Sequence, residues 1–330
     1  MSPRSIADGT WNRASPEERC EGILGPASPT IQARQSLFVA MALVVAGRVT
    51  PTNVALLTAA RALDMDAALL PVEEALRRSL PGDTVLARLD VRRSLDGVEP
   101  GFEQLDRLLE RGVRLVNPPS ALLAAHDKLQ TAIRLAEAGV PHPRTAHVDD
   151  ESPAPNLEFP VVVKPRFGSW GRDVVLCEDD RDLRRALSRL RRRQWFRKQG
   201  ALVQELVPPR GYDLRVVVSS GSVIGAIKRV AATGEWRTNV ALGGTRVATR
   251  VSASACRLAT AAAEALGCDL VGIDLMPRRG GYVVLEVNAC VDFNETYSFD
   301  GRDVFADALR PFVAEEAAVG AAGERALSLV

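Results

Sequence analysis

The stretch VGIDLMPRRGGYVVLEVN, residues 271–288, contains two apolar runs on either side of a basic, glycine-containing segment. This pattern predicts a β-hairpin that turns at about Arg279–Gly281. Glu286 and Asn288 are two residues apart on one strand and therefore share a face. If the two strands pair about the centre of the turn, Asp274 lies opposite Glu286 on that same face. The stretch thus predicts a hairpin with oxygen-bearing side chains gathered on one side.

Two carboxylates directly opposite each other repel, so a positive charge is expected between them. Oxygen donors from Asp, Glu and Asn suit Mg²⁺ or Mn²⁺, which also bind phosphate oxygens. The alternative is a solvated strand face that carries acids by chance. The valines and leucines around these acids favour the metal site, with Asp274, Glu286 and Asn288 as its ligands.

The stretch KPRFGSWGRDV, residues 164–174, places Gly168 and Gly171 between two apolar runs. It predicts a second hairpin, whose glycines let backbone N–H groups approach phosphate oxygens closely. The stretch is not a P-loop, because GxxxxGK[ST] is absent and a strand follows. A plain turn is the alternative. Lys164, just before the glycines, favours a lid over phosphates.

The expected secondary structure differs between the N-terminal part of the chain and the part that contains these two hairpins. Strands alternate with helices over residues 38–117, which predicts a parallel sheet covered on both faces. After residue 159 strands predominate. The expected strands are 42–48, 67–72, 83–89, 114–118, 159–165, 173–178, 201–207, 213–230, 271–276 and 282–288. The expected helices are 52–65 behind a threonine cap, 102–112, 119–139, 181–198, 252–267 and the tail after 303.

Composition restricts the class of protein. The 330 residues carry a formal net charge of +1, so no global attraction to nucleic acid or anionic membrane is expected. Five scattered cysteines without a CxxC pair argue against a disulfide framework and favour a reducing cytoplasm. The most apolar run, residues 37–47, is too short to span a bilayer and is interpreted as a buried strand. We therefore expect a cytoplasmic protein with neither nucleic acid nor membrane as a partner.

Residues 40–312 carry an ordered set of motifs that resembles the ATP-grasp ligases, and most of all the RimK-like carboxylate–amine (alpha-L-glutamate) ligases. The motifs are HDK (126–128), GVPHPRT (139–145), VVVKPRFGSWGRDV (161–174), VQE (203–205), YDLRVVV (212–218), AIKR (226–229), RTN (237–239), GIDL (272–275) and EVN (286–288). The resemblance implies an α/β fold in which an N-terminal α/β domain precedes two antiparallel-sheet lobes that grip ATP. The implied parts are a mobile extension (1–35), the N-terminal α/β domain (36–118), a central lobe with the phosphate lid (119–206), a C-terminal lobe with the Mg²⁺ site (207–312) and a tail (313–330).

The resemblance also implies roles for individual residues. Lys128 and Lys164 would bind the phosphates and base of ATP. Glu205 would sit at the hinge beside adenine and ribose, with backbone contacts from Gln204 and Leu206. The lid would consist of Gly168, Ser169, Trp170, Gly171 and Arg172, and the nucleotide site would further include Asp213 and Lys228. The metal ligands Asp274, Glu286 and Asn288 would hold two Mg²⁺ ions. Arg229 would stabilise the transferring phosphoryl group, and the acyl phosphate or substrate carboxylates would be met by Arg215, Arg237 and Asn239.

The implied activity is an ADP-forming ligation through an acyl phosphate, with L-glutamate or a similar amino acid joined to a carboxylate. Such phosphoryl transfer needs positioning and charge neutralisation and no Ser, Cys or His nucleophile. One alternative is a ligase that acts on an acidic carrier protein or a natural-product intermediate, similar to the amino-group-carrier ligases of lysine biosynthesis. Others are a kinase on the same scaffold and a catalytically silent binding protein. The resemblance also implies a homo-oligomer.

Three stretches depart from the common pattern or fall outside it. Arg172 occupies a lid position where a small residue is frequent. EVN is followed by ACVDFNETYSF instead of a small-residue run such as SSPG, which makes Asn294, Glu295 and Tyr297 candidates for substrate selection. The basic stretch 181–198 is either a solvated helix face or a dock for an acidic partner. His126 is interpreted as a supporting or surface residue, and the alternative is a place in the lining of the nucleotide pocket.

Overall fold

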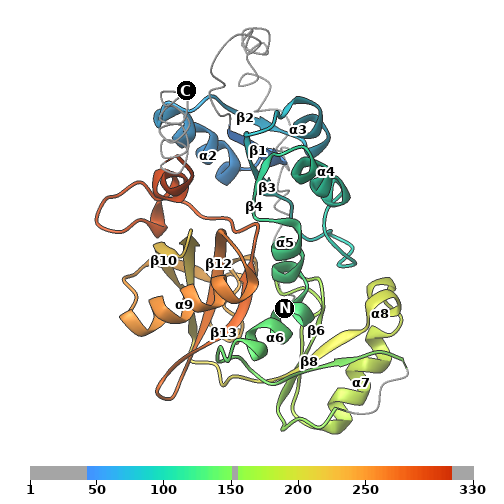
Figure 1. Cartoon of the computed structure of the whole chain (residues 1–330). Coiled ribbons are helices and arrows are strands. Elements are labelled where there is room, and N and C mark those ends of the chain that lie inside the picture. The colour runs from blue at the N-terminus through green and yellow to red at the C-terminus, as the bar shows by residue number, and fades with distance from the viewer. Residues whose placement is uncertain (1–42, 151–154, 314–330) are drawn as a thin grey trace, which may run out of the picture. The chain divides into compact units, whose positions relative to one another are not determined.

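The computed structural model describes residues 43–150 and 155–313. Within these ranges the chain forms three sheets (Figure 1). The expected N-terminal extension (1–35), the start of the opening apolar run (37–42) and the tail after residue 313 lie outside the described residues. No helix in the described part of the chain is long and apolar enough to cross a membrane.

The first sheet is parallel, as the alternation of strands and helices predicted, and has the strand order β2-β1-β3-β4. Its strands are β1 (Leu43–Gly47), β2 (Ala67–Leu70), β3 (Thr84–Arg88) and β4 (Arg114–Val116). Its helices are α2 (Pro51–Ala62), α3 (Val72–Arg78) and α4 (Leu105–Glu110), the last preceded by a 3₁₀ turn, Phe102–Gln104. Thr50 caps α2 by accepting a hydrogen bond from the Asn53 N–H. The short α3 was not predicted because seven residues show little periodicity.

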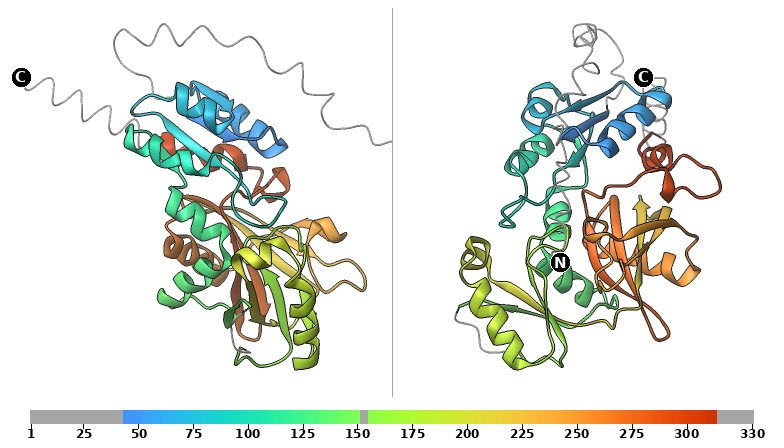
Figure 2. Two further views of the ribbon diagram at one scale, coloured as in Figure 1. Left: turned by 90° about the vertical axis from the view of Figure 1, so that its right-hand side faces the viewer. Right: turned by 180° about the vertical axis from the view of Figure 1, so that it is seen from behind.

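The central sheet is antiparallel, with the order β5-β8-β6-β7. Its strands are β5 (Thr145–Val148), β6 (Val161–Pro165), β7 (Val175–Cys177) and β8 (Ala201–Glu205). The pairing of β6 with β7 confirms the predicted glycine-rich hairpin. Helices α7 (Asp180–Leu190) and α8 (Gln194–Gln199) cover this sheet, and we call the assembly the central lobe (Figures 1 and 2). The single helix expected over 181–198 is wrong, because the break lets Trp195 and Phe196 of α8 enter the core.

The C-terminal sheet is antiparallel and has the order β11-β10-β9-β12-β13. Its strands are β9 (Tyr212–Ser219), β10 (Ser222–Val230), β11 (Thr245–Ala248), β12 (Leu270–Arg278) and β13 (Gly281–Asn288). Helix α9 (Ala253–Leu266) packs on it, and residues 304–313 form a further helix. The predicted hairpin register is confirmed, since Asp274 pairs with Glu286 and the turn closes between Arg278 and Gly281.

Two helices replace the single helix expected over 119–139. They are α5 (Pro119–His126) and α6 (Lys128–Glu137), and they are separated by Asp127. Asp127 has an extended backbone, and its carboxylate caps α6 at the Leu129 N–H and pairs with Arg166. The break is therefore stabilised by a residue 39 positions away, which local propensity cannot reveal.

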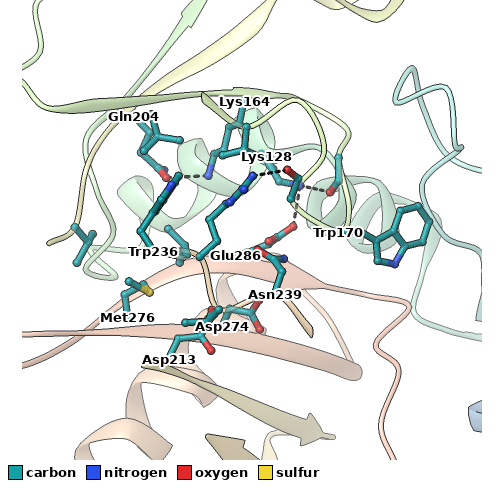
Figure 3. A pocket seen from close by; sticks show the side chains of 18 of the residues that line it. Lys128, Lys164, Trp170, Gln204, Asp213, Trp236, Asn239, Asp274, Met276 and Glu286 are labelled. Carbon is teal, nitrogen blue, oxygen red and sulfur yellow. Dashed lines mark hydrogen bonds and ion pairs between the residues drawn. The ribbon is translucent and has the colours of Figure 1, made fainter. Parts of the chain in front are cut away.

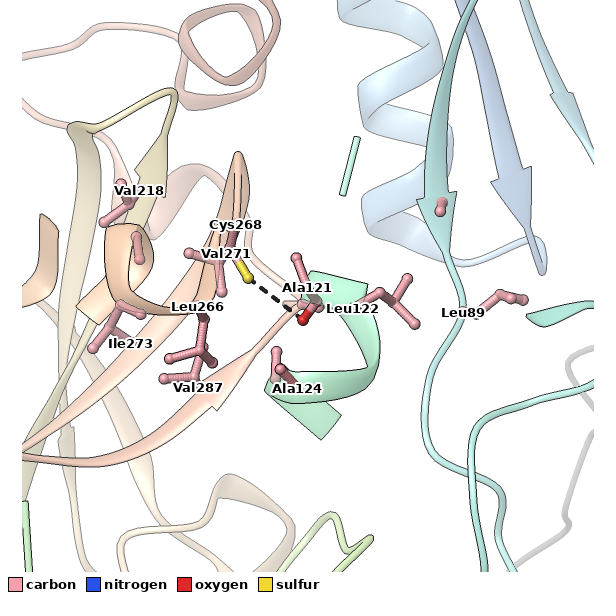
Figure 4. Packing of buried hydrophobic residues seen from close by; sticks show 14 of the residues in the cluster. Leu89, Ala121, Leu122, Ala124, Val218, Leu266, Cys268, Val271, Ile273 and Val287 are labelled. Carbon is pink, nitrogen blue, oxygen red and sulfur yellow. Dashed lines mark hydrogen bonds between the residues drawn. The ribbon is translucent and has the colours of Figure 1, made fainter. Parts of the chain in front are cut away.

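Helix α5 joins two parts of one hydrophobic core. Figure 4 shows Ala121 and Ala124 on the side of the C-terminal sheet and α9, whereas Leu122 points towards Leu89 beyond β3. The Cys268 thiol donates to the Ala121 carbonyl at 3.7 Å. Strands from the parallel sheet and from the C-terminal sheet thus share the same buried cluster.

A loop that follows β3 reaches the central lobe. We call residues 90–98, which are closed by a bridge between Val91 and Val98, the bridging loop. Leu95 at its tip is 2% exposed and belongs to the same buried cluster as Val163 and Trp195. Beside it, Asp96 accepts hydrogen bonds from the Lys198 ammonium and the Gln199 side-chain amide. The bridging loop is therefore anchored in the central lobe by one apolar side chain and one ion pair.

Replacing Leu95 with Ala tests this anchor. Truncating a buried leucine typically costs about 2–5 kcal/mol of folding free energy. We expect Leu95→Ala to lower the chemical-denaturation midpoint clearly. Leu109, which is 43% exposed, provides the matched control, and Leu109→Ala should shift the midpoint little. Equal midpoints for the two variants would contradict the placement of Leu95.

Candidate active site

A cavity lies where the central lobe faces the C-terminal sheet (Figure 3). Its polar wall carries both predicted lysines and the acids of the β12–β13 hairpin, and its apolar wall carries Val162, Leu206, Trp236, Met276 and Leu285. The predicted site residues that line it are Lys128, Lys164, Gly168, Ser169, Trp170, Gly171, Arg172, Gln204, Glu205, Leu206, Asp213, Arg229, Arg237, Asn239, Asp274 and Glu286. Segments between residue 128 and residue 286 thus meet around a space that is apolar at one side and charged at the other.

Lys128 connects the glycine-rich loop to the carboxylate hairpin. Its ammonium donates to the Gly168 carbonyl at 2.6 Å and lies 2.8 Å from the Glu286 carboxylate. Lys128 is the first residue of α6 because the helix breaks at Asp127. In a continuous helix its side chain would point in another direction around the helix axis. The lysine is therefore held between the lid and the acids.

Lys164 is buried on β6 and donates to the Gln204 side-chain oxygen at 2.8 Å. Burial and, to a smaller extent, the charge of Lys128 lower the pKa of its ammonium to about 8, although Glu286 acts in the opposite direction. A bound anion such as a phosphate would favour the charged form. At a pH near 8, Lys164 is therefore expected to gain a proton when an anion enters the cavity.

The residues predicted to form the phosphate lid, 168–172, lie in the turn between β6 and β7, and this turn is called the lid below. Gly171 has a φ of +68°, and a Cβ there would lie 3.1 Å from the Asn239 side-chain oxygen, so any other residue would be strained. Arg237 donates to the Gly171 carbonyl at 3.2 Å, and Arg172 donates to the Arg93 carbonyl of the bridging loop at 2.8 Å. Arg172, which occupies a position where a small residue is frequent, therefore links the lid to the bridging loop in the N-terminal half of the chain.

The residues predicted to form the hinge lie at the end of β8, and two of their polar groups are already engaged. The Leu206 N–H donates to the Pro160 carbonyl at 3.0 Å, and the Glu205 carboxylate lies 3.0 Å from Arg144. Any contact of these two groups with a base or a ribose would have to replace or share the present bonds.

A buried ion network underlies the acidic hairpin. Arg215 donates to both oxygens of Asp274 at 2.7 Å, and Arg229 donates to Asp274 at 2.8 Å. Arg229 also forms a bidentate pair with Asp213, which accepts a further hydrogen bond from Thr238 at 2.6 Å. Burial opposes ionisation of Asp274, but the two arginines outweigh it and lower the pKa of Asp274 to about 2.

The same network keeps the arginines charged. Burial disfavours the guanidinium of Arg215, yet Asp274 raises its pKa above the ordinary value. For Arg229, burial and the charge of Arg215 lower the pKa, but Asp274 and Asp213 raise it by more. Both side chains are therefore fixed cations.

The donors of the hairpin fit a divalent cation only in part. Asp274 already accepts three hydrogen bonds, and a carboxylate offers about four lone-pair directions, so it has little capacity left. Glu286 has a single lysine contact, and the buried side-chain nitrogen of Asn288 has no hydrogen-bond partner among the described residues. An amide with an unpaired atom can turn its oxygen towards a cation. Glu286 and Asn288 are thus better suited than Asp274 to bind a cation directly, and Asp274 would support them from the ion network.

A second cavity adjoins the first and shares part of its wall. The shared residues are Ser169, Trp170, Arg229, Asn239 and Glu286. The other residues of the second cavity are Asp90, Arg215, Val240, Ala241, Arg246, Asn288, Cys290, Val291, Asp292 and Tyr297. Arg215 and Asn288, predicted to meet substrate and metal, therefore face this second space.

Some predicted residues lie elsewhere. Lys228 lines neither cavity within the described chain and lies 4.2 Å from the centre of the Tyr212 ring, because it is on the strand face opposite Arg229. Tyr297 lines the second cavity, whereas Asn294 caps the Thr296 N–H. His126 is buried and bonds to the Leu89 carbonyl at 2.8 Å, in accordance with a supporting role.

The basic stretch is partly neutralised by local acids, which pair with five of its nine cations. The ion pairs are Arg184–Asp180, Arg185–Asp182, Arg191–Asp150, Arg193–Asp173 and Lys198–Asp96. They favour the solvated helix face over a dock, and a carrier protein as partner stays a prediction.

Sequence reasoning missed the apolar wall of the first cavity. Leu285 is unpaired in the register, because Asp274 pairs with Glu286 and Leu275 with Val284. This β-bulge lets two consecutive residues, Leu285 and Glu286, face the same cavity. Met276 could have been predicted from the sequence, since it lies two positions after Asp274 and therefore on the same face of the strand. Trp236 had no comparable periodic pattern to reveal it.

Comparison with known proteins places the chain in a family. The model of the RimK-like ATP-grasp domain matches residues 125–309, and the chain belongs to this family. Beta-citrylglutamate synthase B of Danio rerio is 35% identical over 212 residues, which cover 61% of this chain and 50% of that protein. A probable alpha-L-glutamate ligase of Stenotrophomonas maltophilia is 33% identical over 199 residues, which cover 58% of this chain and 67% of that one. The chain thus spans half to two thirds of these relatives.

Solved structures confirm the fold. The RimK-domain ATP-grasp protein of Sphaerobacter thermophilus matches with a TM-score of 0.57 and 24% identity, over 82% of this chain and 97% of that one. The D-alanine–D-alanine ligase of Bacillus anthracis, in complex with ATP, matches with a TM-score of 0.57 and 16% identity, over 78% and 89%. The predicted α/β ATP-grasp fold is therefore correct.

The low pKa of Lys164 predicts proton uptake on nucleotide binding. In the free protein the ammonium loses its proton as the pH rises through about 8, and a bound phosphate raises the pKa again. We expect Mg-ADP binding at pH 8 to take up about half a proton and at pH 6.5 almost none. Calorimetry in two buffers of different ionisation enthalpy measures this uptake. Lys164→Arg, which stays charged, should bind without uptake, and equal uptake in both proteins would contradict the assignment.

Proposed function

We propose that the protein is an ATP-dependent, ADP-forming carboxylate–amine ligase that joins L-glutamate or a similar amino acid to a carboxylate. The observation that carries this proposal is the shared wall of two adjacent cavities, which includes Arg229 and Glu286. One cavity combines an apolar end with two lysines, as ATP requires, and the other combines arginines with acids, as a second polar substrate requires. The names of the two curated relatives both refer to glutamate, which supports glutamate as the amino acid.

In the first step a carboxylate oxygen of the substrate attacks the γ-phosphorus of ATP, the bond to the β–γ bridging oxygen breaks, and ADP leaves an acyl phosphate. Such a transfer depends on positioning and on neutralising negative charge. Lys128 and Lys164 supply two cations at the polar end of the first cavity, and the lid covers it with Gly168 and Gly171. Mg²⁺ held by Glu286 and Asn288, with Asp274 behind them, would supply further charge neutralisation.

In the second step the ammonium of the amino acid loses a proton to solvent, and the free amine attacks the acyl carbon. The bond from that carbon to the phosphate oxygen breaks, inorganic phosphate leaves, and the nitrogen releases a second proton to solvent, so that an amide forms. Arg215 and Arg229 remain cations here because Asp274 raises the pKa of both. They face the second cavity from the C-terminal sheet and can bind the departing phosphate. Asn239 adds a neutral polar group to the wall that both cavities share.

The test is ADP release from the purified full-length chain with Mg-ATP. L-Glutamate is combined with a panel of carboxylates, including citrate and short peptides, and the products are analysed by mass spectrometry. We expect ADP release that requires both a carboxylate and an amine, and a product whose mass is the sum of the two minus water. A phosphorylated product formed without any amine would establish a kinase instead.

Glu286→Ala is the matched loss-of-function variant. It removes the hairpin carboxylate with the greatest free capacity for a cation and should abolish turnover. Glu264 on α9 is exposed, and Glu264→Ala should retain activity. Near-normal turnover by Glu286→Ala would refute the assignment of the metal site.

A further inference from the structure

The second cavity carries charges of both signs that have not been given a role. Its volume of about 260 Å³ is far larger than the roughly 10–15 Å³ that one water molecule needs, so it can hold a small molecule. Arg215 and Arg229 in its wall pair with Asp274 and Asp213 and are assigned above to the departing phosphate. Glu286 is paired with Lys128. The remaining ionisable groups of opposite sign are Arg246, Asp90 and Asp292.

Asp292 is an exposed side chain on a rigid backbone. The carbonyl before it, on Val291, accepts from the buried Arg88 guanidinium at 2.7 Å. The carbonyl after it, on Phe293, accepts from the Thr52 hydroxyl at 3.1 Å. Val291 and Phe293 on either side are buried, and the side chain of Asp292 points out of the core between them. The segment that departs from the family pattern after Asn288 thus presents a fixed carboxylate to the cavity.

Asp90 is held in a similar way at the start of the bridging loop. Its N–H donates to the Glu99 carboxylate at 3.0 Å, and its carbonyl accepts from the Glu99 N–H at 2.8 Å. The preceding carbonyl, on Leu89, bonds to His126. One carboxylate oxygen accepts from the Val91 N–H at 2.6 Å, and neither Asp90 nor Asp292 has a cationic partner in the described ranges.

Arg246 lies on the edge strand β11, where it pairs with Arg229 of β10 across the ladder. Its side chain is exposed and has no acidic partner among the described residues. Two like charges directly opposed on neighbouring strands are unfavourable. A ligand carboxylate beside Arg246 would relieve this repulsion, just as Asp213 and Asp274 do for Arg229.

We propose that Arg246, Asp90 and Asp292 form the subsite for the amine substrate and select a zwitterionic amino acid. The substrate carboxylate binds Arg246, and its ammonium lies at Asp90 and Asp292. This arrangement, which rests on the proposed ligase function, holds the nitrogen in the cavity that shares Arg229, Asn239 and Glu286 with the nucleotide site. It also couples the amine site to the lid, because Asp90 begins the loop whose Arg93 carbonyl accepts from Arg172.

The test compares Michaelis constants in three conservative variants, Arg246→Gln, Asp90→Asn and Asp292→Asn. Each should raise the KM for L-glutamate about tenfold or more, because a charged hydrogen bond is lost. The KM values for ATP and for the carboxylate should change much less. Equal increases in all three constants, or an unchanged KM for L-glutamate, would overturn the proposal.

Matched controls come from an ion pair outside the cavity. Arg250 and Asp300 are exposed and bind each other, and neither lines the second cavity. Arg250→Gln and Asp300→Asn make the same chemical changes nearby and should leave the KM for L-glutamate unaltered. A comparable increase in these controls would attribute the effect to net charge and not to the subsite.

Two further measurements separate binding from folding and from the ligase function itself. Glutarate lacks the ammonium, so the wild-type protein should bind L-glutamate more tightly than glutarate, and Asp292→Asn should reduce this preference. Hydroxylamine can replace the amine and trap the acyl phosphate as a hydroxamate without using the subsite. If no carboxylate yields ADP with either nucleophile, the proposed function fails. If the wild-type enzyme turns over and the variants keep its KM for L-glutamate, only the subsite fails.

Discussion

The bond that the rest of the site depends on is the bidentate contact between Arg215 and Asp274. It joins β9 to β12 in the middle of the C-terminal sheet, and Arg229 and Asp213 extend it to β10. Removing one member of such a buried set would leave an uncompensated charge, which typically costs about 3–5 kcal/mol. The network fixes the strand that faces Glu286 and surrounds the hairpin acids with permanent cations. It therefore provides the positive charge that two opposed carboxylates need.

The site also depends on contacts that bring distant segments to this hairpin. The helix break at Asp127 presents Lys128 to both the lid and Glu286. The bridging loop inserts Leu95 into the central lobe and accepts the lid residue Arg172 at Arg93. The lid is thereby connected, through the bridging loop, to Asp90 in the wall of the second cavity.

Much of the fold followed from periodicity and turn residues. The register of Asp274 with Glu286 could be predicted because a short glycine turn leaves few alternatives. The break at Asp127 could not, since Arg166, which stabilises it, is remote in sequence. The order of the motifs identified Arg215 and Arg229 as site residues. It could not show that they form ion pairs with Asp274 and Asp213. Lys228 shared a motif with Arg229, yet strand alternation turns it away from the cavities. Nor could the bulge at Leu285 be foreseen, because it depends on packing between strands.

Isotope transfer tests the central claim, chemistry through an acyl phosphate, most directly. The carboxylate that supports turnover is labelled with ¹⁸O, and the reaction is run with Mg-ATP and L-glutamate. An acyl phosphate transfers one labelled oxygen from the carboxylate to the released inorganic phosphate, and mass spectrometry should find it there. Inorganic phosphate without label, or label in AMP, would contradict this account.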